Sequence, residues 1–191
     1  MKNSMRVVLV AAAALASGCV QSSPLLLLGI FPTEAMAACT PSDTGFQSSA
    51  EYSFSSVPSA TQVCLGAKNL LAGDLRIEIG GKTLDDPESR NIIFIEEVLH
   101  TYSAIITANS KSQSLSLPAE TLREGFSVKP DDKAGAFVSL LGDTAAQSLF
   151  DGTQVGDRVD VLVTFRLRGR INSGGSITSQ PFTWPVRYTR Q

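Results

Sequence analysis

Apolar and polar residues alternate strictly over residues 158–168, near the C-terminus of the chain. Successive side chains of a β-strand point to opposite faces, so a period of two places the apolar side chains on one buried face. A second alternation over residues 182–189 follows the turn signal Gly174-Gly175. The two segments therefore predict a long β-hairpin with one buried face. Pro185 has no N–H to donate, so we expect the last strand to lie at a sheet edge or to carry a bulge there.

Shorter apolar stretches with strand character, separated by turn signals, precede this hairpin. They lie at residues 52–57, 63–71, 75–79, 92–99, 102–108 and 113–117. A helical repeat of apolar residues occurs over Ser139 to Phe150, where we expect one short helix. Many short strands with little helix predict an all-β fold, an antiparallel β-sandwich with at most one short helix.

The N-terminus has the pattern of a signal peptide. Lys2 and Arg6 precede an apolar run over residues 7–16, which is too short to span a bilayer. A second apolar run, Leu25 to Phe31, is followed by Ala35-Met36-Ala37, the small-x-small pattern that signal peptidase accepts. We therefore expect residues 1–37 to be a signal peptide that is removed before Ala38, leaving residues 38–191 as one domain.

A competing processing site lies further upstream. The segment Leu15-Ala16-Ser17-Gly18-Cys19 resembles the lipobox of bacterial lipoproteins, in which Cys19 would become the lipidated first residue. The protein is exported under either interpretation. The later site is favoured because a Leu-rich run ending in Ala-x-Ala is unusual for the hydrophilic tether of a lipoprotein.

Cleavage before Ala38 leaves two of the three cysteines, Cys39 and Cys64. An even number of cysteines in an oxidising compartment predicts a disulfide between them. No later apolar stretch reaches membrane-spanning length, so we expect no transmembrane segment in the mature chain.

Residues able to do chemistry are few. His100 is the single histidine, so no His/Cys metal cluster can be assembled, and we expect no metal, no cofactor and no catalytic residue. The acidic pairs Asp85/Asp86, Asp131/Asp132 and Asp151/Asp157 lie in turn-like sequence, where Asp mainly bonds its own backbone. An exported hydrolase that uses these pairs is the weakest of the interpretations.

The charge pattern bears on possible partners. The formal net charge is −2 at pH 7 and the chain has no basic block, so we expect no nucleic-acid partner. Five arginines fall on polar positions of the last two strands and could form a basic stripe. They are Arg166, Arg168, Arg170, Arg187 and Arg190. A solvated strand face is the simpler interpretation, and binding of an anionic surface or glycan is the alternative.

Three short segments resemble the spore coat protein U domain, the subunit domain of archaic chaperone-usher pili. The first is Cys64-Leu65 continuing into Leu70-Leu71-Ala72-Gly73. The second is Phe137 to Gly142 together with Leu149-Phe150-Asp151-Gly152, and the third is the closing alternation from Ile177 to Tyr188. Cys39, directly after the expected cleavage point, also fits this family, so the resemblance runs from about Cys39 to Tyr188.

The resemblance implies an immunoglobulin-like sandwich that is incomplete and takes one strand from a partner by β-strand addition. The partners would be a periplasmic chaperone, an outer-membrane usher and other pilus subunits. The strand-acceptor groove would be bordered by Phe182, Trp184, Val186 and Tyr188. The protein would then be a structural or adhesive pilus subunit that supports surface attachment and biofilm formation. The alternative is a periplasmic or outer-membrane lipoprotein with a binding role, lipidated at Cys19.

Under the same resemblance, a subunit donates an alternating apolar segment that precedes its first cysteine. Cleavage before Ala38 leaves one residue ahead of Cys39. Such a subunit is expected to accept a strand but not easily to donate one, unless residues 40–57 serve as an unconventional donor.

Overall fold

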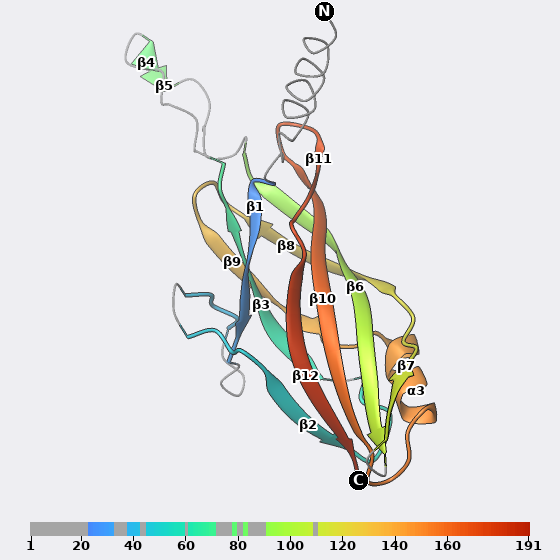
Figure 1. Ribbon diagram of the computed structural model, residues 1–191. Helices are drawn as coiled ribbons and strands as arrows, with labels where there is room; N and C mark the ends of the chain where they lie inside the picture. The colour runs from blue at the N-terminus through green and yellow to red at the C-terminus, as the bar shows by residue number, and fades with distance from the viewer. Residues whose placement is uncertain are drawn as a thin grey trace, which may run out of the picture.

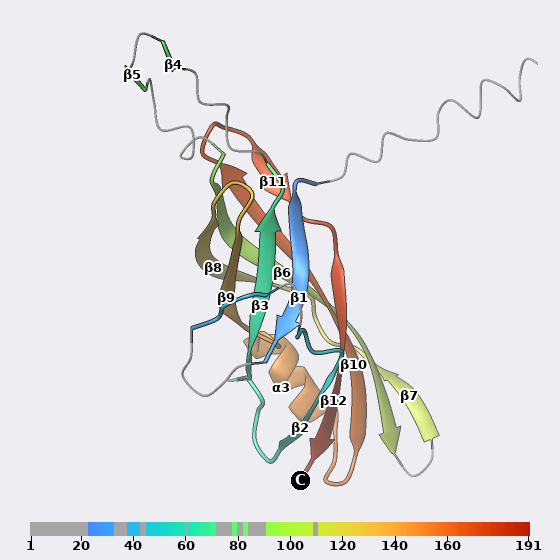
Figure 2. The ribbon, with the colours of Figure 1, turned by 90° about the vertical axis from the view of Figure 1, so that its left-hand side faces the viewer.

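The computed structural model describes residues 23–32, 38–42, 45–59, 61–71, 78–79, 82–83, 91–108 and 111–191. Nearly all of their regular structure is strand, and the strands form two larger sheets that pack face to face (Figures 1 and 2). The all-β sandwich expected from the alternating pattern is therefore confirmed. Two short strands, β4 (Glu78–Ile79) and β5 (Lys82–Thr83), pair with each other.

The smaller sheet has three strands in the order β1-β3-β9. They are β1 (Leu25–Phe31), β3 (Gln62–Asn69) and β9 (Lys133–Ser139), and both pairs are antiparallel. Strand β1 therefore lies at an edge of the sandwich, alongside β3. It belongs to the segment that the sequence pattern assigned to the signal peptide.

The larger sheet has the order β2-β12-β10-β6-β7, with β8 and β11 paired to β6 and β10. Its strands are β2 (Ala50–Phe54), β6 (Ile93–Ala108), β7 (Lys111–Leu115), β8 (Glu120–Val128), β10 (Arg158–Ile171), β11 (Ser176–Thr178) and β12 (Phe182–Arg190). The predicted hairpin is confirmed, since β12 pairs antiparallel with β10 along residues 158–165.

One pair departs from the expected antiparallel pattern: β2 runs parallel to β12, over Val186 to Arg190. The chain contributes β1 to the smaller sheet and then crosses over to contribute β2 to the larger one. Pro185 lies just ahead of the β2 pairing, where β12 has β10 as its strand neighbour. The missing N–H of Pro185 therefore costs no bond to β2, although β12 as a whole lies inside the sheet, between β2 and β10, and not at the predicted edge.

The predicted short helix is present as α3 (Asp143–Asp151), between β9 and β10. Ala145, Ala146 and Leu149 are buried on its inner face. At its N-terminus the carboxylate of Glu120 accepts the backbone N–H groups of Thr144 and Ala145, both at 3.0 Å. These bonds satisfy two of the N–H groups that a helix start leaves without partners.

Two expectations at the level of elements need correction. Residues 92–99 and 102–108 form one 16-residue strand, β6, rather than two. No strand was expected over residues 120–138, but β8 and β9 occupy residues 120–128 and 133–139. Gly125 and Gly135 lie within these strands. The predicted strand over residues 75–79 lies largely outside the described residues.

Candidate strand-acceptor site

The four residues predicted to border a groove all lie on β12, and the structure brings three of them together in the core. Trp184 and Val186 are 1% and 2% exposed, and Tyr188 is fully buried. Phe182 is partly buried against the same core. The predicted face is therefore apolar and continuous, but strands of the same chain cover it rather than leaving it open.

Strand β1 supplies part of that cover. Leu25 and Ile30 are fully buried and Leu27 is 8% exposed, and all three belong to the main core. Residues 25–31 pair with residues 69–64 of β3, with a register shift between Leu27 and Gly29. We call the edge of β3, together with the part of the core that these three side chains fill, the β1 seat.

The two ends of β1 are held by further backbone bonds. Leu70 donates its N–H to the carbonyl of Pro24 at 2.7 Å, and Gln47 donates to the carbonyl of Ile30, also at 2.7 Å. The carbonyl of Gln47 in turn accepts the indole N–H of Trp184 at 2.9 Å. Gln47 thus links β1 to β12, so that Trp184 contributes to the same site as the N-terminal strand.

Two glycines leave room for close contacts at the β1 seat. A β-carbon on Gly66 of β3 would lie 2.5 Å from the ring of Phe31 and 2.9 Å from Pro41, so a larger residue would clash. Gly29 of β1 has φ +145°, a conformation that residues with a β-carbon rarely adopt. Its neighbours in space are Phe46 and Phe182. Both strands of the contact, β1 and β3, thus have a glycine where their neighbours approach closely.

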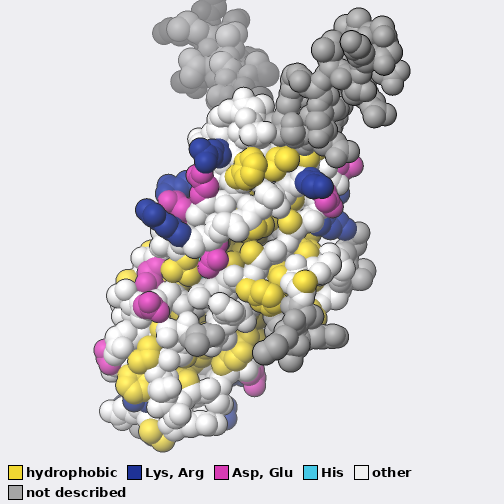
Figure 3. All heavy atoms as spheres, turned by 180° about the vertical axis from the view of Figure 1, so that it is seen from behind, with side chains coloured by type: hydrophobic (Ala, Val, Ile, Leu, Met, Phe, Trp, Pro, Cys, Tyr) yellow, Lys and Arg dark blue, Asp and Glu magenta, His cyan; other side chains and the backbone are white. Residues whose placement is uncertain are grey.

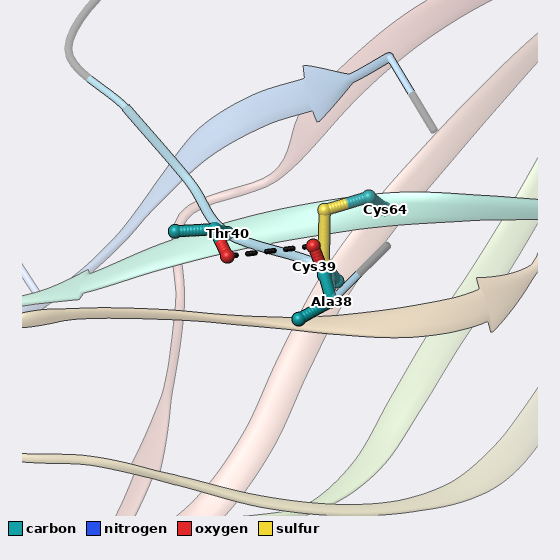
Figure 4. Close-up of a disulfide and its surroundings, with 4 residues drawn as sticks. All are labelled: Ala38, Cys39, Thr40 and Cys64. Carbon is teal, nitrogen blue, oxygen red and sulfur yellow. Dashed lines mark hydrogen bonds between the residues drawn. A yellow bond between two sulfur atoms is a disulfide. The ribbon is translucent and has the colours of Figure 1, made fainter. Parts of the chain in front are cut away.

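A disulfide lies next to the β1 seat and confirms the predicted pair. Cys39 and Cys64 are bonded, with their Cα atoms 5.3 Å apart (Figure 4). Cys64 is also the residue of β3 that pairs with Phe31, the last residue of β1. The disulfide links Cys39, in the segment after β1, to β3, the strand with which β1 pairs.

The five arginines predicted to form a basic stripe are mostly engaged within the molecule. Arg168 and Arg170 form ion pairs with Glu97 and Glu96, and Arg187 bridges Asp160 and Glu51. Arg190 donates to the carbonyls of Phe150 and Thr153 at the end of α3. No ion pair of Arg166 is found among the described residues. The simpler interpretation, a solvated face, therefore fits better than an anion-binding stripe.

The surface opposite to the view of Figure 1 also mixes both signs of charge. Basic and acidic side chains lie side by side there, with apolar groups exposed between them (Figure 3). Paired charges of opposite sign give little net field to attract a polyanion.

Two of the acidic pairs serve local structure. Asp131 and Asp132 form a turn in which Asp132 accepts the N–H of Lys133 at 2.8 Å. Asp157 accepts the backbone N–H of Gln154 at 2.7 Å, and Asp151 accepts an N–H of the side-chain amide of Gln147. Asp85 and Asp86 lie outside the described residues. Among the residues that the structure describes, no three His, Cys, Asp or Glu side chains are grouped as metal ligands.

The single histidine lies in β6 and is buried among aromatic rings. His100 is 1% exposed and packs edge-on against Phe165 and near Tyr102. Burial lowers the pKa of its imidazole, while the nearby backbone of Val98 and Ser139 and the carboxylate of Glu120 act in the opposite direction. Burial also disfavours the charged form of Tyr102, and it therefore raises the pKa of this hydroxyl to about 12. The hydroxyl of Tyr102 accepts the N–H of Gly142 at 3.2 Å, next to the start of α3.

The sequence pattern did not identify β1 as part of the site. Its inward residues are Leu25, Leu27 and Ile30, so the alternation is interrupted by the register shift. A run of apolar residues ahead of Ala-x-Ala is also what a signal peptide presents. The alternation of Leu25 and Leu27, with Gly29 after them, is the signal that could have indicated a strand with a bulge.

Comparison with known protein families found no match, and comparison with curated proteins found none. A solved structure with some similarity is Spo0M, a sporulation control protein from Bacillus subtilis, at 11% identity and a TM-score of 0.28. The aligned region covers 65% of this chain and 41% of the Spo0M chain, so the match spans less than half of that protein. No helix among the described residues is long and apolar enough to cross a membrane.

Proposed function

We propose that the protein is an exported subunit of a chaperone-usher type pilus, which assembles by β-strand addition and supports surface attachment and biofilm formation. The observation that carries the proposal is the β1 seat, an edge position filled by a short apolar strand ahead of the first cysteine of the disulfide. A periplasmic chaperone, an outer-membrane usher and other subunits would be its partners. The resemblance to the spore coat protein U domain supports the same function.

The position of β1 suits exchange between chains. It has β3 along one side, and on the other side the described residues contribute one backbone bridge, at Gln47. An extended segment with alternating side chains can add to such an edge from another molecule, because backbone bonds give affinity and the side chains give specificity.

Filling the β1 seat is worth a large share of the stability of a domain. Burying one large aliphatic side chain contributes about 1.5–3 kcal/mol, so Leu25, Leu27 and Ile30 together contribute at most about 5–9 kcal/mol. Domains are typically stable by about 5–15 kcal/mol in total. An empty seat would therefore leave a marginal and aggregation-prone domain, which is why the proposal includes a chaperone.

A disulfide trap tests which chain fills the seat. Leu26 and Lys68 are direct partners in the β1–β3 pair, and both lie at least partly exposed. Directly paired residues in antiparallel strands have Cα separations that a disulfide can span. In chains exported together with their chaperone, Leu26→Cys/Lys68→Cys should give a ladder of covalent oligomers on non-reducing gels.

The single substitutions Leu26→Cys and Lys68→Cys serve as controls and should give no ladder. A bond formed only within one chain, in a monodisperse monomer that refolds reversibly, would contradict the proposal. The protein would then be a self-contained sandwich.

A second function is favoured by one observation: β1 of the same chain already closes the sandwich. A self-contained module needs no partner strand, which suits a periplasmic or outer-membrane lipoprotein with a binding role, lipidated at Cys19. Incorporation of labelled palmitate that Cys19→Ser abolishes would support this function. Absence of the label, with the wild-type protein found outside the membrane fraction, would exclude it.

A further inference from the structure

We infer that the leader peptide ends ahead of Ser23, so that residues 25–31 remain in the exported protein as its first strand. The inference goes beyond the proposed function, because it concerns which peptide bond is hydrolysed on export. Cleavage before Ala38 would remove β1 entirely.

The first support is the fit of β1 to the rest of the domain. A signal peptide needs an apolar run but no defined register. Residues 25–31 instead pair with residues 69–64 of β3, and a bulge between Leu27 and Gly29 returns Ile30 to the core after Leu25 and Leu27. Phe31 points to the opposite side of the strand, where it is 4% exposed.

The second support comes from residues beyond Ala38 whose arrangement depends on β1. Gly66 has no β-carbon at the point where the ring of Phe31 approaches, although Pro41 also lies close there. The N–H of Gln47 bonds to Ile30, and the N–H of Leu70 bonds to Pro24. Removal of residues 1–37 would leave both donors without these partners and would expose the core behind Leu25 and Ile30.

The third support is that the sequence offers earlier cleavage points. Lys2 and Arg6 precede the apolar run, which ends in Ala14-Leu15-Ala16, a small-x-small pattern. Cleavage there would make Ser17 the first residue. The lipobox-like segment ending at Cys19 offers a second point. At either position water is consumed to split one peptide bond, and β1 stays with the domain.

The cysteines are compatible with either cleavage point, because the bond between Cys39 and Cys64 does not involve Cys19. Cys39 and Cys64 are bonded to each other, which leaves Cys19 without a partner among the cysteines of the chain. In an exported protein that keeps it, Cys19 is therefore a free thiol, a lipidated residue or a cysteine bonded to another chain. Mass spectrometry under non-reducing conditions distinguishes these forms.

The experiment is the intact mass and N-terminal sequence of the full chain after export in a bacterial host. We expect a first residue between Ser17 and Ser23, with added acyl mass if Cys19 is lipidated. A first residue at Ala38 would overturn the inference.

Two variants sharpen the result. Ala37→Leu blocks cleavage before Ala38 and should leave export and processing unchanged. Ala16→Leu/Cys19→Ser blocks both upstream points and should accumulate as uncleaved precursor. The reverse pattern, with precursor accumulating only for Ala37→Leu, would also overturn the inference.

The outcome separates this inference from the proposed function. An N-terminus at Ala38 in an oligomer would end the inference, but it would leave strand addition intact, with the strand coming from another protein. An upstream N-terminus in a protein that forms the Leu26→Cys/Lys68→Cys bond only within one chain would keep the inference and contradict pilus assembly.

Discussion

At the scale of single residues, His100 illustrates how burial converts a titratable group into a source of pH-dependent stability. Its pKa in the folded state lies below the ordinary value of 6.5, chiefly because burial disfavours the charged ring. The unfolded chain therefore binds more protons than the folded chain below about pH 6.5. Stability should be full above that pH and should fall as the pH drops toward the folded-state pKa.

Urea unfolding between pH 7.5 and about pH 5.5, above the range in which exposed carboxylates titrate, measures this effect. The unfolding midpoint of the wild-type protein should fall across this window. The variant His100→Gln cannot be protonated, so its midpoint should change much less, whatever its absolute stability. Equal slopes for the two proteins would show that His100 is not responsible.

Glu120 supports a second prediction at this scale. Its carboxylate accepts two backbone N–H groups at the start of α3, as an N-capping side chain does. Glu120→Ala should lower the free energy of unfolding by about 0.5–2 kcal/mol, the usual cost of losing a cap. Glu120→Gln, which keeps one acceptor oxygen, should lose less. Glu124→Ala, on the same strand, is the matched control, and an equal loss there would argue against a capping role.

At the scale of elements, strands with a regular alternation were predictable and strands with an interruption were not. The hairpin of β10 and β12 followed from the sequence because its buried residues recur at every second position. Strand β8 also alternates, but its inner side is mostly only partly buried and includes Glu120 and Glu124, so the pattern carried little hydrophobic signal. In β1 the bulge shifts the inward positions, and the apolar run resembled a leader.

The candidate strand-acceptor site, like the strands, could be predicted from the sequence only in part. The apolar face of β12 could be predicted, because Trp184, Val186 and Tyr188 share one side of a strand. What covers this face depends on contacts between distant segments, such as the bond from Trp184 to the carbonyl of Gln47. No local pattern encodes such a contact.

Strand β1 gives the sharpest prediction for an element. In the exported protein, Ile30→Ala should lower the free energy of unfolding by about 2–5 kcal/mol, the usual cost of truncating a buried aliphatic side chain. Leu26, on the same strand, is 40% exposed, so Leu26→Ala should change stability far less. Denaturant unfolding of the two variants measures the difference. Equal, small effects would show that β1 does not occupy its seat in solution.

At the scale of the whole molecule, the disulfide connects the N-terminal segment to the rest of the sandwich. The pairing of Cys39 with Cys64 was predicted because these two cysteines remain after the expected cleavage before Ala38, in an oxidising compartment. The location of the bond beside β1 could not be predicted, since it depends on how β3 and the following segment pack. The disulfide thus restrains the chain at Cys39, directly after the cleavage point expected before Ala38.

The last prediction concerns the contribution of this bond to global stability. The bonded cysteines are 25 residues apart, and closing a loop of this size stabilises a domain by about 3 kcal/mol in the chain-entropy model. Cys39→Ala/Cys64→Ala should lower the free energy of unfolding by about that amount, and dithiothreitol should shift the wild-type midpoint in the same direction. Because the variant has no bond to reduce, its own midpoint should not respond to the reductant. A variant as stable as the oxidised wild type would mean that the strands alone hold residues 38–42 against β3.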